Sequence, residues 1–213
     1  TDTGGSADIW EVHHTGGATI DYSGGPLLAA ANNTSGFENL VVDVWDNTSE
    51  NVLIDNGLLG GDFDAIIIQD TFSEAGGPLG AGDVDADVNN VTILGLDENR
   101  DVVVAANSFN DITLTAAPGS GPLQLHLLGS NDTASGDLPP GFGDDITGNN
   151  IDVTGADLDI FLNDDNADLG IVSLDPGGTV SLSGAITGNV NVEVDTDGAT
   201  IDATGLTTGG GNF

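Results

Sequence analysis

The chain has 213 residues, 38% of them hydrophobic, and 35 acidic residues face a single basic one, Arg100, giving a formal net charge of -34. This hydrophobic content is enough to fill a core, which excludes a disordered acidic tail. Nucleic acid and anionic lipid are excluded as partners because both need Lys and Arg. The absence of cysteine excludes disulfides, thiolate metal sites and cysteine nucleophiles.

The charge imbalance makes the chain repel itself, so a compact state needs counter-charges from bound cations or concentrated salt. The acidic residues divide into 29 Asp and 6 Glu. Asp is the shorter ligand and the better turn former. This bias favours cation-binding loops between strands over a merely halophilic surface.

The longest strongly hydrophobic run is residues 65–68, far short of the roughly 18 to 20 residues of a membrane helix. We therefore expect a soluble protein without membrane insertion. Because the chain begins at Thr1 and shows no signal-like segment, we expect a mature, processed product or a fragment.

In chain order, strands are expected first around residues 9–12, 19–22, 40–45, 52–54 and 65–68. After them, apolar strand centres recur about every ten residues, at Ile93, Val103, Leu114, Leu125, Ile151, Ile160, Ile171, Leu182, Val192 and Ile201. Helices are not expected, because Gly is plentiful, Lys, Arg and Met are nearly absent, and no stripe of 3.6-residue period occurs.

Short strands at this spacing indicate a β-sandwich, a barrel or a β-solenoid. Stacked solenoid turns often carry Asn and Gly at repeated corners, and Asn89-Asn90, Asn149-Asn150 and Gly188-Asn189 each precede a strand centre. The prediction is an all-β fold with a β-solenoid, similar to a parallel β-helix, for at least the second half. A β-sandwich or jelly roll is the alternative.

Two proline-containing stretches interrupt the pattern, one at residues 118–122 and one at residues 130–145, which contain Pro139 and Pro140. The second stretch is either a domain junction or a loop projecting from one continuous stack. We predict a single elongated β domain over residues 1–213.

Clusters of Asp in loops are the expected signature of Ca²⁺, which is bound by several oxygen ligands at once. Asp83, Asp85 and Asp87 alternate, so they share one face of a strand or converge in a loop, but they do not match an EF-hand. The predicted metal ligands are Asp83, Asp85, Asp87, Asp164, Asp165, Asp168, Asp195, Asp197, Asp55, Asp62 and Asp64.

Catalysis has no local signal, since no G-x-S-x-G nucleophile elbow occurs. A carboxylate-pair glycosidase is compatible with any Asp-rich chain, but aromatic residues for stacking sugars are few. A polysaccharide lyase would need a basic residue, for which Arg100 is the candidate. We therefore predict a protein that is not an enzyme, with a carbohydrate-active enzyme on a β-helix as the third alternative.

Asp-, Asn-, Gly- and Thr-rich β repeats without Cys and almost without Lys or Arg resemble bacterial surface-layer proteins and calcium-dependent secreted adhesins of the RTX type. The stretch Ala199-Thr200-Ile201-Asp202-Ala203-Thr204-Gly205-Leu206-Thr207 is similar to their Thr- and Gly-rich strand repeats. Their nonapeptide G-G-x-G-x-D does not occur, although residues 208–212 approach it. The resemblance implies a self-assembling lattice or filament with Ca²⁺ bridging acidic surfaces.

The resulting prediction is an extracellular or cell-surface structural protein whose main partner is itself. Subunits of such charge associate only where cations neutralise the contact or where pairing of strand edges overrides the repulsion. The alternative is the ligand-binding module of a secreted adhesin, for which surface glycans are the expected partner.

Overall fold

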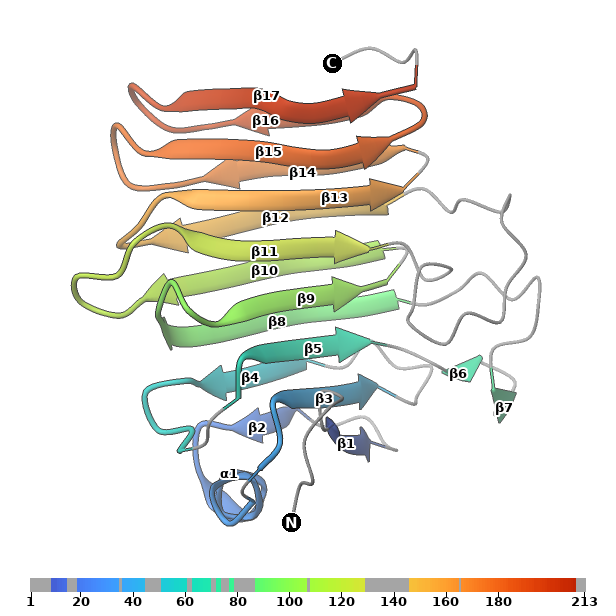
Figure 1. The fold of residues 1–213 in the computed structure, drawn as a ribbon, viewed down its shortest axis with the longest axis vertical. Helices are drawn as coiled ribbons and strands as arrows, with labels where there is room; N and C mark the ends of the chain where they lie inside the picture. Colours follow the sequence, from blue (N-terminus) through green and yellow to red (C-terminus); the bar gives the residue numbers. More distant parts are fainter. Residues whose placement is uncertain are drawn as a thin grey trace.

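A computed structural model describes residues 9–14, 19–34, 36–44, 51–60, 63–69, 72–73, 77–78, 87–106, 108–128, 146–164 and 166–209. Within these residues the protein is nearly all β, as predicted, with two large parallel sheets, one helix and one short antiparallel pair (Figure 1). The antiparallel pair is formed by β6 (Phe72–Ser73) and β7 (Gly77–Pro78).

Sheet A has eight strands in the order of the chain. They are β1 (Ile9–His14), β3 (Asn39–Val44), β5 (Ala65–Gln69), β9 (Asp101–Ala105), β11 (Leu123–Leu128), β13 (Leu158–Asp164), β15 (Thr179–Ile186) and β17 (Thr200–Thr208).

Sheet B has seven strands, also in the order of the chain. They are β2 (Ile20–Tyr22), β4 (Asn51–Asp55), β8 (Asp87–Leu96), β10 (Ser108–Ala116), β12 (Ile146–Thr154), β14 (Ala167–Ser173) and β16 (Val190–Val194).

The chain passes from one sheet to the other at each step, so a sheet-B strand, a turn and a sheet-A strand form one repeat. Every strand pair in both sheets is parallel, whereas sandwiches and jelly rolls are built mainly from antiparallel strands. The arrangement is consistent with the predicted solenoid.

From β8 to β14, paired positions in neighbouring sheet-B strands reveal a constant repeat length with one exception. Ile112 pairs with Val91 and Val172 pairs with Ile151, and the chain advances by the same interval in both pairs. Ile151, however, lies nearly twice as far along the chain from its own partner, Ile112. The extra residues fall in the connection from β11 to β12, which contains residues 130–145, and both sheets continue in register across this insertion.

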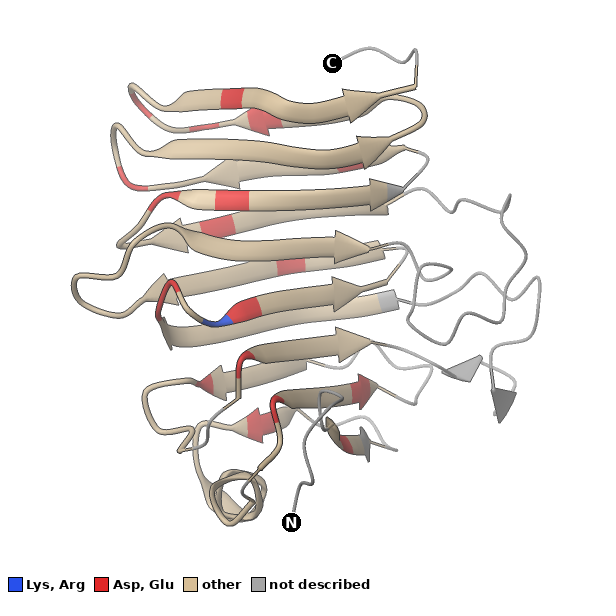
Figure 2. Ribbon diagram, in the orientation of Figure 1, with Lys and Arg blue, Asp and Glu red and all other residues tan. Residues whose placement is uncertain are grey.

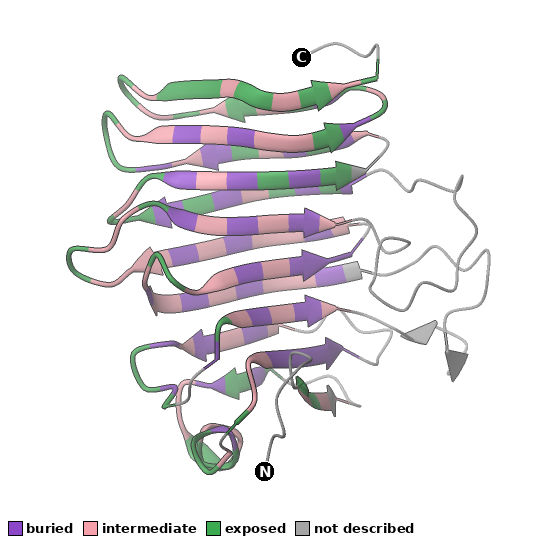
Figure 3. Ribbon diagram, in the orientation of Figure 1, coloured by how far each residue is buried: buried purple, intermediate pink, exposed green. Residues whose placement is uncertain are grey.

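The core lies between the two sheets. Inward-facing side chains of sheet A stack in columns, such as Val102, Leu125, Ile160 and Leu182, all of which are buried (Figure 3). This column follows from the period-two alternation of apolar residues, which places one face of each strand against the opposite sheet. The repeating apolar residues therefore form one continuous core.

The predicted strand centres are confirmed as strands, but Val103 and Ile171 do not face the core. In β14 the residues Gly170 and Ile171 both point outward, and Val172 takes the buried position. The same pair of outward residues occurs in β12 at Asn149 and Asn150. In both β12 and β14, two consecutive residues that are not buried interrupt the alternation of buried and exposed positions. The next buried position is therefore displaced by one residue.

Helix α1 (Gly25–Asn32) contradicts the expectation that no helix occurs. Its Pro26 stands in the first helical turn, where a missing N–H is harmless, and a run of three Ala favours the helix. Eight residues are too few to show a periodic stripe. No described helix is long and apolar enough to cross a membrane.

The α1 segment lies at the N-terminal end of the two sheets, and its Ala31 is buried while Leu27 and Leu28 pack against the core (Figure 1). Beside it, the ring of Trp10 stands edge-on to Tyr22, with centroids 6.3 Å apart, and stacks on Phe63 at 6.4 Å. This end of the core is therefore covered.

Candidate functional site

The turns that lead from sheet B to sheet A all lie on one edge of the molecule, which we call the turn edge, because the strands within each sheet are parallel (Figure 1). Here carboxylates connect successive turns. Glu98, between β8 and β9, accepts hydrogen bonds from the N–H of Gly121 at 2.9 Å and from the hydroxyl of Ser120 at 3.0 Å, both between β10 and β11. These bonds hold the pKa of Glu98 below its ordinary value, the Gly121 bond most strongly.

Two further carboxylates connect the next pair of turns. Asp175, which follows β14, accepts a hydrogen bond from the N–H of Gly155 at 2.8 Å, and Asp157, which precedes β13, accepts one from the N–H of Thr179 at 2.7 Å. The bonds run in opposite directions between the same two turns. Acidic side chains thus satisfy backbone donors that the turns leave outside the sheets.

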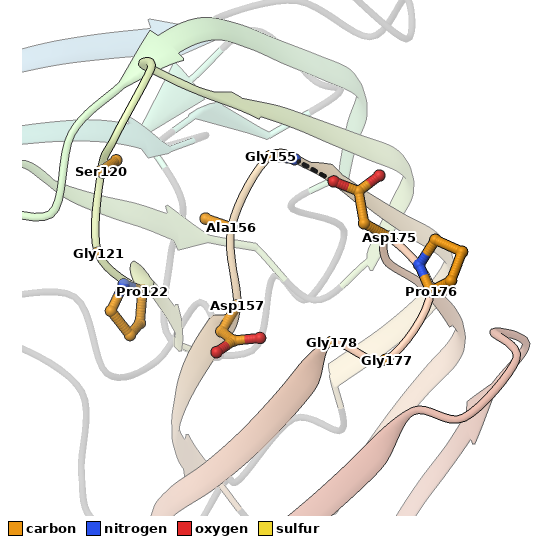
Figure 4. A pocket seen from close by; sticks show the side chains of 10 residues that line it. All are labelled: Ser120, Gly121, Pro122, Gly155, Ala156, Asp157, Asp175, Pro176, Gly177 and Gly178. Carbon is orange, nitrogen blue, oxygen red and sulfur yellow. Dashed lines mark hydrogen bonds between the residues drawn. The ribbon is translucent and has the colours of Figure 1, made fainter.

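A hollow of about 400 Å³ lies where three successive turns meet, at the centre of Figure 4. Asp157 and Asp175 contribute its two carboxylates, and both side chains are exposed. In each of them one oxygen accepts the hydrogen bond described above, and a second carboxylate oxygen remains as a ligand of the type that Ca²⁺ prefers. The lining residues are Ser120, Gly121, Pro122, Gly155, Ala156, Asp157, Asp175, Pro176, Gly177 and Gly178.

Arg100, the single basic residue of the sequence, belongs to the turn between β8 and β9 and appears blue among acidic residues in Figure 2. Its Nη1 donates a hydrogen bond to Oδ1 of the buried Asn56, in the turn one repeat earlier. Partial burial lowers the pKa of Arg100, and the nearby charges of Asp97 and Asp64 oppose that shift. The only guanidinium is therefore used to join two turns.

Only some of the predicted metal ligands lie among the described residues. Asp62, Asp83, Asp85 and Asp165 lie outside the described residues, and only the backbone is described for Asp87, the first residue of β8, and for Asp164, the last of β13. The structure therefore does not test these six positions as metal ligands, and they stay predictions.

Among the other five, Asp55 and Asp64 flank the turn between β4 and β5, while Asp195 and Asp197 belong to the turn between β16 and β17. Strands β4 and β16 stand five positions apart in sheet B, about 24 Å at the usual spacing of strands, so the structure does not bring these two pairs together. Asp168 lies near the start of β14, at the opposite edge.

Two of these carboxylates already accept hydrogen bonds. Asp55 accepts one from the N–H of Gly57 at 3.0 Å, and Asp168 accepts one from the N–H of Gly170 at 3.2 Å and one from Asn191 Nδ2 at 3.5 Å. Within the described part of the chain, no three His, Cys, Asp or Glu side chains converge to hold an ion. An ion at these positions would therefore need further oxygen ligands, such as backbone carbonyls, amide side chains, water or groups of another subunit.

Sequence reasoning missed the carboxylates that connect the turns, Glu98, Asp157 and Asp175. A signal for one of them is present, since Asp175 begins the run Asp-Pro-Gly-Gly, in which Asp, Pro and Gly each favour a turn position. The partners, however, lie 20 to 23 residues away along the chain, and only the register of the strands brings them together.

Comparison with known proteins gives no match: no protein-family model, no curated protein and no solved structure is similar to this chain.

Proposed function

We propose that this chain is an extracellular structural protein, a β-solenoid whose copies assemble into a filament or surface layer, with Ca²⁺ stabilising its acidic surface. The observation that carries the proposal is the use of carboxylates on the turn edge. Glu98, Asp157 and Asp175 each join neighbouring turns by accepting backbone hydrogen bonds. A structural role explains why acidic residues recur in successive turns. A single active site would not explain this recurrence.

The charge of the chain supports a role for cations in assembly. A formal charge of -34 opposes contact between copies, and Arg100, the single basic residue, is already engaged within the subunit. Divalent cations are the simplest counter-charge, because oxygens of exposed Asp side chains on two copies can share one ion. The expected partner is therefore another copy of the chain, with Ca²⁺ between them.

The proposal is tested by negative-stain microscopy and light scattering on purified protein, titrated from excess chelator to millimolar Ca²⁺. Filaments or sheets that appear with Ca²⁺ and disappear with chelator are the expected result. A monodisperse monomer under every condition would rule out self-assembly as the function.

A pair of variants separates the turn edge from net charge. The double variant Asp157→Asn, Asp175→Asn keeps an oxygen acceptor in both turn bonds but removes two charges at the hollow. Its control, Asp152→Asn with Glu193→Gln, removes two charges from exposed positions in β12 and β16. If Ca²⁺ binds at the hollow, only the first variant raises the Ca²⁺ concentration needed for assembly. Equal shifts would assign the effect to net charge alone.

A specific feature of sheet A favours the second candidate, the ligand-binding module of an adhesin. Phe161 is 39% exposed on the outer face, its ring lies 5.3 Å from that of His126, and Gln124 donates a hydrogen bond to Asp159 at 2.8 Å beside them. An exposed aromatic ring next to hydrogen-bonding side chains is a surface on which a sugar ring can stack.

A glycan screen tests this candidate, with Phe161→Ala as the variant and Ile171→Ala, which alters a similarly exposed apolar residue of sheet B, as the control. Binding that Phe161→Ala abolishes and Ile171→Ala preserves would support a glycan partner. Absence of binding to every glycan, in a protein that assembles with Ca²⁺, would leave the structural role alone.

A further inference from the structure

In the described part of the chain, the last strand of sheet A carries a residue of the core column that is largely exposed. Leu123, Leu158, Val180 and Ile201 occupy paired positions in four successive strands, β11, β13, β15 and β17. The first three are at most 1% exposed, whereas Ile201 is 39% exposed. Ile201 thus takes the inward column of the core, and its exposure arises because it belongs to the final repeat.

Sheet B ends in the same way. Val194 of β16 pairs with Val172 of β14, yet Val172 is fully buried and Val194 is only partly buried. In Figure 3 the final repeat, β16 and β17, is mostly exposed, in contrast to the regular buried positions of the strands beside it. The C-terminal end of the core is therefore open across both sheets.

The two ends of the core differ. At the N-terminal end, helix α1 packs against the core, and Ile20, Tyr22 and Leu40 are at most 3% exposed. At the other end, β17 pairs with β15 on one side, and no described strand pairs with it on the other. Its outer edge presents backbone N–H and C=O groups along nine residues, which is a template for another strand.

We propose that this end is the contact between two copies, which join around a two-fold axis so that β17 of one copy pairs antiparallel with β17 of the other. The inference deepens the proposed self-assembly and rests on it. In such a contact Ile201 of each copy is covered by the partner, and the core becomes continuous through the pair. The two-fold relation lets both copies use the same surface.

The size of this end suits a second copy. A strand of nine residues spans about 30 Å, and two sheets about 10 Å apart form an end about 20 Å wide with their side chains. Because β16, the last strand of sheet B, has only five residues, each copy buries about 500 Å² and the pair about 1,000 Å², the size of a weak interface. An interface of this size is stable only when the charge repulsion is screened.

Charge makes the pair dependent on salt. Each copy has a formal charge of -34, and Asp195, Asp197 and Asp202 belong to the final repeat, so the contact brings negative charge of one copy against negative charge of the other. High salt or Ca²⁺ screens this repulsion while the apolar contact through Ile201 persists.

Contact through this end alone forms a pair and nothing larger, because α1 covers the other end of the core. A filament or layer therefore needs a second contact, through the sheet faces or edges.

The experiment is multi-angle light scattering of the full chain between 0.1 M and 3 M KCl, with and without millimolar Ca²⁺. The expected result is a doubling of the monomer mass as KCl is raised without Ca²⁺, and growth beyond the pair when Ca²⁺ adds a second contact. Ile201→Asp should keep the chain monomeric, whereas Ile171→Asp, which adds a charge at a similarly exposed position on the outer face of β14, should leave the doubling unchanged.

Hydrogen exchange of the unaltered protein gives a readout that does not depend on how a variant folds. Those amides of β17 whose N–H groups point away from β15 should exchange at least tenfold more slowly in the pair than in the monomer. Assembly that proceeds equally with Ile201→Asp, without protection of β17, would overturn this contact and leave self-assembly intact. A monomer in every salt and Ca²⁺ condition would overturn both.

Discussion

The side chain of Glu98 accepts a hydrogen bond from the backbone N–H of Gly121, 2.9 Å away and 23 residues further along the chain. The contact joins two turns whose flanking strands are neighbours in the sheets, β8 beside β10 and β9 beside β11. It makes the acidic composition part of the fold, because an ionised carboxylate is a stronger acceptor than a neutral one.

Glu98→Gln should therefore lower stability at neutral pH and leave it nearly unchanged in acid. The folded pKa of Glu98 lies below the ordinary value of 4.5, so its contribution is present above pH 4.5 and is lost as the pH falls through the folded pKa. Urea midpoints between pH 3 and 7 measure this. Asp152→Asn, which removes one exposed charge from β12, is the control for the loss of a negative charge.

Tyr22 should set the alkaline limit of stability. Burial raises the pKa of Tyr22 to about 12 from 10, so its contribution is fully present below pH 10 and is lost as the pH rises towards 12. Two pKa units at about 1.4 kcal/mol each make this loss on the order of 2 to 3 kcal/mol.

Absorbance at 295 nm reports this ionisation cleanly, since Tyr22 is the only tyrosine and the chain has no cysteine. Titration of the folded protein should give a midpoint near 12, and titration in urea one near 10. Tyr22→Phe should flatten the fall in stability between these values, although it removes the 3.5 Å contact with His14. A folded-state midpoint near 10 would contradict the burial of this ring.

Gly184→Ala should be strongly destabilising, by about 2 to 4 kcal/mol. Gly184 has a φ of +107°, and a Cβ there would lie 2.0 Å from the carbonyl oxygen of Leu162 in the adjacent strand. The matched control is Gly119→Ala, where φ is +83° and a Cβ meets nothing within 4 Å. This control should lose only about 1 kcal/mol, from the backbone conformation alone. Equal losses in chemical unfolding would mean that the neighbouring strand gives way.

Arg100→Gln should destabilise the protein by about 1 to 3 kcal/mol at low salt, because it removes the charged donor to Asn56 and leaves Asp97 and Asp64 without their nearby cation. Part of the loss should return in 2 M KCl, since salt screens the repulsion between the carboxylates. Urea midpoints at both salt concentrations measure the difference. A loss that does not change with salt would assign the effect to the hydrogen bond alone.

The all-β class and the strand positions could be predicted from the sequence because apolar residues repeat at a nearly constant interval. The inward residue of each strand could not always be predicted. Ile171 is the more hydrophobic member of Ile171-Val172, yet Val172 is buried, because β14 has two consecutive outward residues and pairs in register with β12. Only the neighbouring strand decides which of the two faces the core.

The candidate site was less predictable than the fold. Clusters such as Asp195 and Asp197 stand out in the sequence, whereas Asp157 and Asp175 are far apart along the chain and share a hollow only through the length of the repeat. Runs of Asp identify places where one loop is acidic. A site assembled from several turns needs the register, which composition does not contain.

The difference between the two edges has a consequence for how this protein can vary in length. Turns on the turn edge are tied to their neighbours through side chains such as Glu98, so an insertion there would break contacts on both sides. On the opposite edge, the connection after β11 takes up residues 129–145 while Ile112 and Ile151 remain paired. Foreign peptides could therefore be grafted into this connection at little cost to the sheets, which would make the protein a scaffold for displaying added segments.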